Sequence, residues 1–171
     1  MPRENLLWDF SVKTYGREGV ASACLRLQDD HGADVNILMY CCWAAQDCAL
    51  LLDAMAIERI ISAVEPWKSS VVEVLRNIRR ELKSKTYQGI DVEEQERLRA
   101  EIKRVELNAE RLQQDALFTM SHPELLGETK DRRGSALENV LLYLNTLPSK
   151  IDVAARSDAK LIVDAAFEAQ F

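Results

Sequence analysis

Cysteine is the most reactive residue type in this chain, and three of its four cysteines lie close together. Cys41, Cys42 and Cys48 fall within the stretch DVNILMYCCWAAQDC, residues 34–48, and Cys24 lies upstream. A zinc or iron–sulfur site needs about four ligands, usually in paired short spacings, and the sequence has no C-x-x-C pair. On one helix, Cys41 and Cys48 would lie about 10 Å apart, too far for a single ion. We therefore predict buried free thiols, with no metal and no cofactor, and a redox sensor built on these thiols is an alternative.

An acidic run, DDHGAD at residues 29–34, is the second candidate. Carboxylates on successive turns of one helix can hold Mg²⁺ against a diphosphate, as in all-α prenyl-chain enzymes. Here Gly32 interrupts the helix between the carboxylates, and no comparable second acidic motif follows. We predict an inter-helix turn in which Asp34 caps a helix that begins at Val35. The alternative is a Mg²⁺-dependent isoprenoid- or diphosphate-type binder or enzyme, with a pocket mouth formed by Asp29, Asp30, Asp34 and Asn36.

A basic segment, residues 76–85, is the third candidate, with five basic side chains against one acidic residue, Glu81. The whole chain carries a net charge of −6 and has a pI of about 5.1, which is the opposite of the balance typical of nucleic-acid binders. A local basic patch in such a chain could contact an acidic protein partner, although a solvated helix face is the simpler interpretation. We predict a protein-binding surface formed by Arg76, Arg79, Arg80 and Lys83.

Motifs of the common enzyme classes are missing. The sequence contains no glycine-rich phosphate loop, no Walker motif and no G-x-S-x-G elbow. We therefore predict no catalytic residue and favour a protein that is not an enzyme.

The elements that must position these residues are predicted to be helices. Apolar residues recur at helical spacing, and runs with period two are missing, so we predict an all-α, single-domain bundle (residues 1–171) of about seven helices and no sheet. The helices are expected at about 4–15, 17–30, 35–48, 50–64, 67–118 (a pair), 136–147 and 149–169. Pro66 is expected to begin a new helix. A Ser135–Glu138 capping box is expected to begin the helix at 136.

The helix pair at 67–118 has the clearest pattern. Two apolar rows keep a four–three spacing and predict a long antiparallel hairpin with a coiled-coil-like seam. Whether the hairpin packs on the body or projects is left open, as is whether the seam pairs within one chain or between chains of a homo-oligomer. The rows are Val71, Leu75, Ile78 and Leu82, then Leu98, Ile102, Val105, Ala109, Leu112 and Ala116.

The compartment is predicted from what the chain lacks. The longest uncharged run, Val35 to Gln46, is shorter than the ~18 apolar residues of a membrane span, and the first ten residues are not those of a secretory signal. Free cysteines fit a reducing compartment. We expect a cytoplasmic protein without a membrane partner.

The first quarter of the chain carries a specific pattern of aromatic, acidic and glycine residues. The pattern is L-W-x-F-S, then L-Q-D-x-x-G-x-D-V-N-x-L, then a tryptophan, and here it runs from Leu7 to Trp43 within the stretch 7–45. This stretch resembles the signature of a small proteobacterial family of uncharacterised all-α proteins. The resemblance implies a helical cytoplasmic protein with no established activity, and it places Asp34 and Asn36 in the family pattern. Together with the missing catalytic motifs, it favours a non-enzymatic helical adaptor or regulator that binds another protein.

Overall fold

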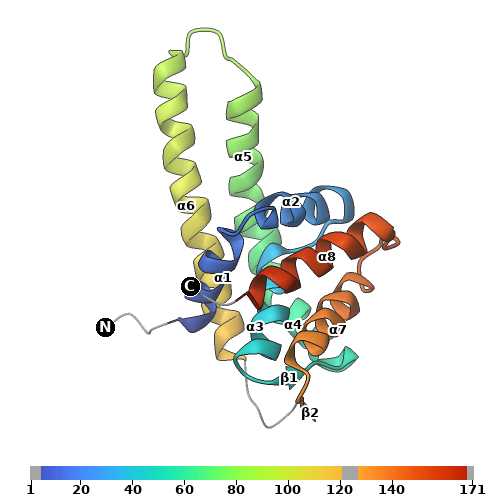
Figure 1. Cartoon of the computed structure of the whole chain (residues 1–171). Helices are drawn as coiled ribbons and strands as arrows, with labels where there is room; N and C mark the ends of the chain where they lie inside the picture. The colour runs from blue at the N-terminus through green and yellow to red at the C-terminus, as the bar shows by residue number, and fades with distance from the viewer. Residues whose placement is uncertain (1–4, 121–126, 169–171) are drawn as a thin grey trace. The chain divides into compact units, whose positions relative to one another are not determined.

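The computed structural model describes residues 5–120 and 127–168, and nearly all of its regular structure is helical (Figure 1). The all-α class with a long antiparallel hairpin is confirmed. Two two-residue strands, β1 (Leu50–Leu51) and β2 (Gly127–Glu128), also pair antiparallel, a feature that the sequence did not predict. In chain order the elements are α1 (Leu6–Tyr15), α2 (Val20–His31), α3 (Val35–Gln46), β1 (Leu50–Leu51), α4 (Ala54–Trp67), a π-helical segment (Lys68–Val72), α5 (Glu73–Ser84), α6 (Val92–Thr119), β2 (Gly127–Glu128), α7 (Arg132–Leu144) and α8 (Val153–Ala166).

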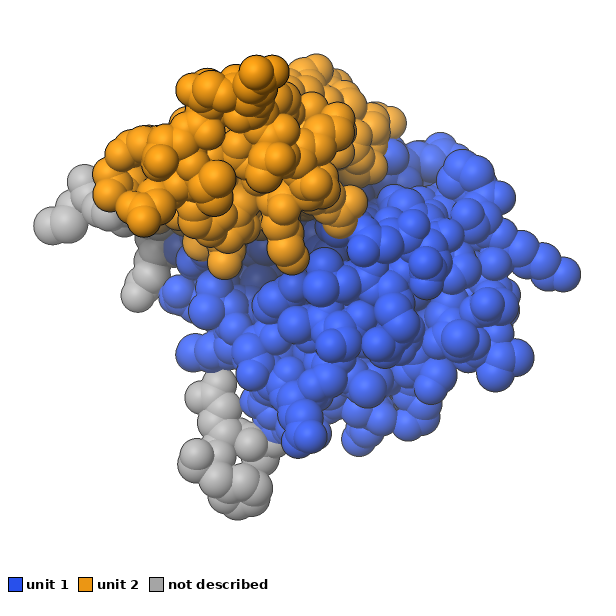
Figure 2. Space-filling model, turned by 90° about the horizontal axis from the view of Figure 1, so that it is seen from above, with its two compact units in different colours: residues 1–61, 114–171 blue, residues 62–113 orange. Residues whose placement is uncertain are grey.

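The chain divides into two compact units, coloured separately in Figure 2. Unit 1 comprises residues 1–61 and 114–171, and unit 2 comprises residues 62–113. Helices α4 and α6 each contribute to both units, because the boundaries fall inside them.

Helix α3 is the centre of unit 1. Every residue from Asn36 to Ala45 is buried, as expected for a helix that is apolar on all sides. It packs against α7, α1 and α8. The predicted N-cap is confirmed, because the Asp34 carboxylate accepts a 2.9 Å hydrogen bond from the backbone N–H of Asn36.

The buried side chain of Asn139 on α7 links α3 to β1. Its Nδ2 donates to the carbonyls of Cys41 (3.2 Å) and Leu50 (3.1 Å), and its Oδ1 accepts from the backbone N–H of Leu52 (2.8 Å). One amide therefore satisfies three backbone groups that would otherwise be buried without partners. It fixes the extended segment that pairs with β2.

Three predicted helix starts are wrong by four residues, and the last of them is α8, which begins at Val153 and not at 149. The chain is extended at Leu50–Leu51, and α4 begins only at Ala54, where the Asp53 carboxylate accepts from the N–H of Ala56. Helix α7 begins at Arg132 with Asp131 as its cap, which accepts a 2.9 Å hydrogen bond from Gly134 N. The predicted capping residue, Ser135, lies inside the helix and bonds Thr129 instead.

Pro66 does not begin a new helix. It lies inside α4, and the helix continues through Lys68–Val72 into α5. Proline has no N–H to donate, and its ring crowds the carbonyl four residues earlier. The wider π-helical turns that follow accommodate this misfit without ending the helix. Ser69 Oγ helps by donating a 2.9 Å hydrogen bond to the Glu65 carbonyl.

In unit 2, α5 and α6 form an antiparallel hairpin. Trp67 Nε1 donates to the Ala109 carbonyl at one end (3.0 Å), and Gln95 Nε2 donates to the carbonyls of Leu82 and Lys85 at the other (2.8 and 2.7 Å). The Asp91 carboxylate caps the start of α6 by accepting hydrogen bonds from the backbone N–H groups of residues 93 and 94 (3.0 Å each). Gln95 therefore joins α6 to the end of α5 within one chain.

Candidate protein-binding surface

One side of the hairpin is held by ion pairs. Arg79 donates two hydrogen bonds to the Glu106 carboxylate, and Arg76 donates to Glu106 (3.2 Å) and to Glu110 (2.8 Å). The Glu106 side chain is only 7% exposed, and its hydrogen bond to Arg79 raises the pKa of that arginine. Two of the four predicted binding residues thus hold the hairpin together.

The other two predicted binding residues, Arg80 and Lys83, are exposed on α5. The four basic residues therefore differ in environment, because Arg76 and Arg79 are partly buried against acids of α6. They do not form one solvated basic patch of the kind that the sequence suggested.

The hairpin also leaves aliphatic side chains half exposed. On α6, the exposed fractions are 49% for Leu98, 49% for Val105 and 46% for Leu112, and on α5 they are 47% for Val74 and 42% for Ile78. Leu98, Val105 and Leu112 are seven residues apart, the spacing that keeps residues on one face of a helix. Val74 and Ile78 are one turn apart on α5.

These five side chains lie on the same side of the hairpin. An antiparallel helix pair has a local two-fold axis perpendicular to the plane of the pair, and Arg79 and Glu106 face each other across it. The residues that directly precede them, Ile78 and Val105, are each rotated by about 100° in the same sense. The two-fold axis therefore places both on one side. We call these five residues the open side of the hairpin.

The acidic run does not converge on a site in the structure. Asp34 is buried, and its carboxylate is engaged at the start of α3. Asn36 is buried and accepts a 2.9 Å hydrogen bond from Gln114 Nε2, so it bonds across a helix contact. Asp29 and Asp30 are exposed near the end of α2. The four residues proposed for a pocket mouth are thus divided between the interior and the surface.

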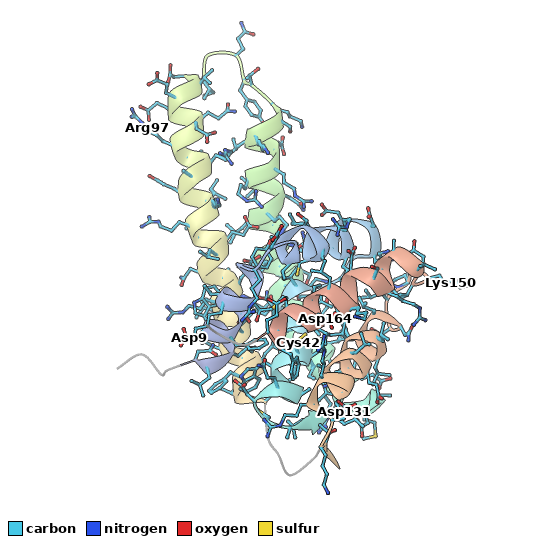
Figure 3. The ribbon with its side chains drawn as sticks, in the orientation of Figure 1. Asp9, Cys42, Arg97, Asp131, Lys150 and Asp164 are labelled. Atoms are coloured by element: carbon cyan, nitrogen blue, oxygen red, sulfur yellow. The ribbon has the colours of Figure 1, made fainter. Side chains whose placement is uncertain are left out.

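The cysteines are free thiols in the part of the chain that the structure describes. Cys24, Cys41 and Cys42 are buried and Cys48 is half-buried, and Figure 3 shows Cys42 among the helices of unit 1. Burial raises the pKa of all four thiols, that of Cys24 to about 12. Among residues 5–120 and 127–168, no group of three or more acidic, histidine or cysteine side chains could hold a metal ion.

A surface cavity of about 390 Å³ lies in unit 1 between α1, the end of α3 and the end of α8. Its wall includes Arg17, which donates to the Glu168 carboxylate (2.9 Å) and carbonyl (3.0 Å). Asp9 and Lys13 also line it, so its wall carries both signs of charge. Sequence reasoning missed this cavity because three segments distant in the chain form it.

The sequence predicted most of the residues of the open side but not their exposure to solvent. The heptad rows identified four of its five residues, all except Val74, but they suggested a closed seam. In the structure, Glu106 instead faces Arg79 of α5, and Ala109 is buried, with its carbonyl bonded to Trp67 of α4. Leu98, Val105 and Leu112 remain partly in solvent. The signal in the sequence was the polar pair Gln95 and Glu106 beside the seam, which mark the face of α6 that pairs with α5 through polar groups.

None of the helices in residues 5–120 and 127–168 combines the length and the apolar character that crossing a membrane requires.

Comparisons with known proteins place the chain in a family. No curated protein and no solved structure matches the chain. Residues 6–117 match a family model described as a protein of unknown function (DUF2390), and this range includes the whole stretch 7–45 that carries the resemblance. The match covers well over half of the chain, which therefore belongs to this family of unknown function.

Proposed function

We propose that this protein is a non-enzymatic cytoplasmic adaptor or regulator that binds another protein through the open side of its hairpin. The observation that carries this proposal is the contrast between the two sides of the hairpin. On one side, Arg76 and Arg79 form ion pairs with acidic residues of α6. On the other side, the five aliphatic side chains of the open side remain about half exposed.

Such a surface suits an amphipathic helix of a partner. Apolar side chains at heptad spacing on two adjacent helices form a groove into which a third helix can lay its apolar face. Completing the burial of five half-exposed aliphatic side chains contributes roughly 1 kcal/mol each. That sum is comparable to the cost of association, which starts at about 4 kcal/mol. We therefore expect reversible binding of moderate affinity.

Affinity purification from native extract, with mass spectrometry, tests this function with two matched variants. Leu98→Asp places a charge on the open side, and Leu107→Asp places the same charge on the opposite face of α6, where Leu107 is equally exposed. We expect a partner that binds the wild type and Leu107→Asp but not Leu98→Asp. A partner lost equally from both variants, or from neither, would contradict the proposed surface.

One double variant tests the basic surface predicted from the sequence. Charge reversal at Arg80 and Lys83 leaves the Glu106 ion pairs intact, since neither residue contributes to them. If that double variant loses the partner while Leu98→Asp keeps it, the basic surface and not the open side binds the partner.

A further inference from the structure

The rows of residues that border the open side carry negative charge. On α6, the positions one turn before Leu98, Val105 and Leu112 flank the apolar stripe on its outer edge, and on α5 the flanking position follows Ile78 by three residues. Three of these four positions are acidic and none is basic. The flanking residues are Glu81, Glu94, Glu101 and Asn108.

These acidic groups are accessible to a partner. The Glu94 side chain is 65% exposed and that of Glu81 is 49% exposed, and Glu101 is exposed as well. Glu94 pairs with Arg97 (2.6 Å), and Glu81 pairs with Lys85 (3.1 Å). Figure 3 shows Arg97 on the side of α6 away from α5. Exposed pairs within one helix are weak, so a cation supplied by a partner can replace them.

We infer that the open side receives an amphipathic helix whose apolar stripe is bordered by lysine or arginine, an inference that rests on the proposed function. The stripe from Leu98 to Leu112 extends about 21 Å along α6, which a partner helix of about 18 residues covers. Basic side chains on both borders of that helix lie within reach of Glu81 on α5 and of Glu94 and Glu101 on α6. Charge complementarity of this kind sets the choice and register of partner helices.

A second copy of the chain fits this surface poorly. If two open sides met face to face, the flanking rows would oppose each other, and Glu94 and Glu101 would approach acidic rows of the other copy. Like charges in such positions oppose pairing. The net charge of −6 on each chain adds to the repulsion. Charge thus selects a basic helix of another protein over self-association.

Two synthetic helical peptides of 18 residues test the inference on the full chain. Both carry leucine at the core positions of the heptad, and they differ only at the border positions, which are lysine in one and glutamate in the other. We expect the lysine peptide to bind about tenfold more tightly than the glutamate peptide in a fluorescence-anisotropy titration. Raising the salt concentration should reduce this preference.

Charge-reversal variants show whether the named acids cause the preference. The double variant Glu94→Lys with Glu101→Lys should lose or reverse the preference. Glu93→Lys is the matched control, because residue 93 lies in the same first turn of α6 as residue 94 but outside the flanking rows, and it should keep the preference.

The remaining outcomes separate the inference from the proposed function. Equal affinity for both peptides overturns the inference and leaves helix binding at the open side in place. If light scattering detects a dimer and the Val105→Asp variant is monomeric, the open side binds a second copy of the chain. That result also overturns the inference. If the chain is monomeric and binds neither peptide, the proposed function itself fails.

Discussion

Arg79 of α5 donates two hydrogen bonds to Glu106 of α6, and Glu106 also accepts one from Arg76. The carboxylate of Glu106 is therefore the common acceptor that joins the two helices of the hairpin. Its burial makes this pairing stronger than an exposed ion pair, because water screens it less. The same contact turns the apolar rows away from a closed seam.

Replacing Glu106 by alanine should destabilise the hairpin. The variant leaves Arg76 and Arg79 partly buried without their shared acceptor, and removing one partner of a buried pair is costly. We expect the free energy of unfolding in urea to fall by about 2 kcal/mol, less than for a fully buried pair, because both arginines still reach water. Glu94→Ala breaks an exposed pair and should change it by less than about 0.5 kcal/mol. A loss at Glu106 no larger than at Glu94 would contradict the role given to this pair.

The sequence predicted the hairpin well and its open side only in part. Heptad spacing depends on local geometry, so residues 71–82 and 98–116 identify two amphipathic helices without any structure. Which sector of each helix faces the other depends on the pairing of side chains across the interface. The pairing of Arg79 with Glu106 joins residues 27 positions apart, and a single sequence does not reveal such a pairing.

Replacing Asn139 by alanine should destabilise unit 1 more than a typical polar-to-alanine change. Its side chain satisfies the N–H of Leu52 and the carbonyls of Cys41 and Leu50, and buried backbone groups left without partners each cost about 1–3 kcal/mol. We expect a loss of about 3 kcal/mol in the free energy of unfolding. Asn108→Ala, also within a helix but exposed, is the control and should change stability little. Equal effects would mean that Asn139 has no special role.

The errors in helix starts have local causes that the sequence conceals. The residue types of the Ser135–Glu138 pattern fit a capping box, yet Asp131 caps α7 instead. Its carboxylate can approach the backbone N–H of Gly134 because glycine has no Cβ. A Cβ at residue 134 would lie 2.2 Å from Asp131 Oδ2. The continuation through Pro66 depends on the π-helical turn that follows it, and proline is more often found at a helix start. The cap of α7 and the continuation of the helix through Pro66 both depend on local contacts that cannot be inferred from the residue types alone.

The thiols should differ sharply in reactivity. Burial raises the pKa of Cys24 to about 12 and also raises that of Cys41 and Cys42, so little thiolate exists at these positions at pH 8. Cys48 is half-buried. We expect the native protein to react slowly with a disulfide reagent at one thiol, and Cys48→Ser should abolish this reaction until the chain is unfolded. Rapid reaction of the native Cys48→Ser variant would instead support a redox role for Cys41 or Cys42.

The stability of unit 1 should depend on pH through Asp164. Hydrogen bonds from Lys160 Nζ (2.7 Å) and Arg133 Nη2 (2.6 Å) lower the pKa of this carboxyl below its ordinary value of 3.8. Because the folded pKa is the lower one, the unfolded chain binds the proton first as the pH falls. The contribution of Asp164 is therefore fully present above about pH 4 and is lost as the pH falls through the folded pKa.

Carboxyl titration by NMR measures this pKa directly. Lys160→Met should raise the pKa of Asp164 toward 3.8, because it removes the larger of the two hydrogen-bond contributions. Lys150→Met is the control, since Figure 3 shows Lys150 well away from Asp164. In urea unfolding, the advantage of the wild type over Asp164→Asn at pH 6 should shrink at pH 3. An advantage that is the same at both pH values would show that the ion pairs of Asp164 do not contribute to stability.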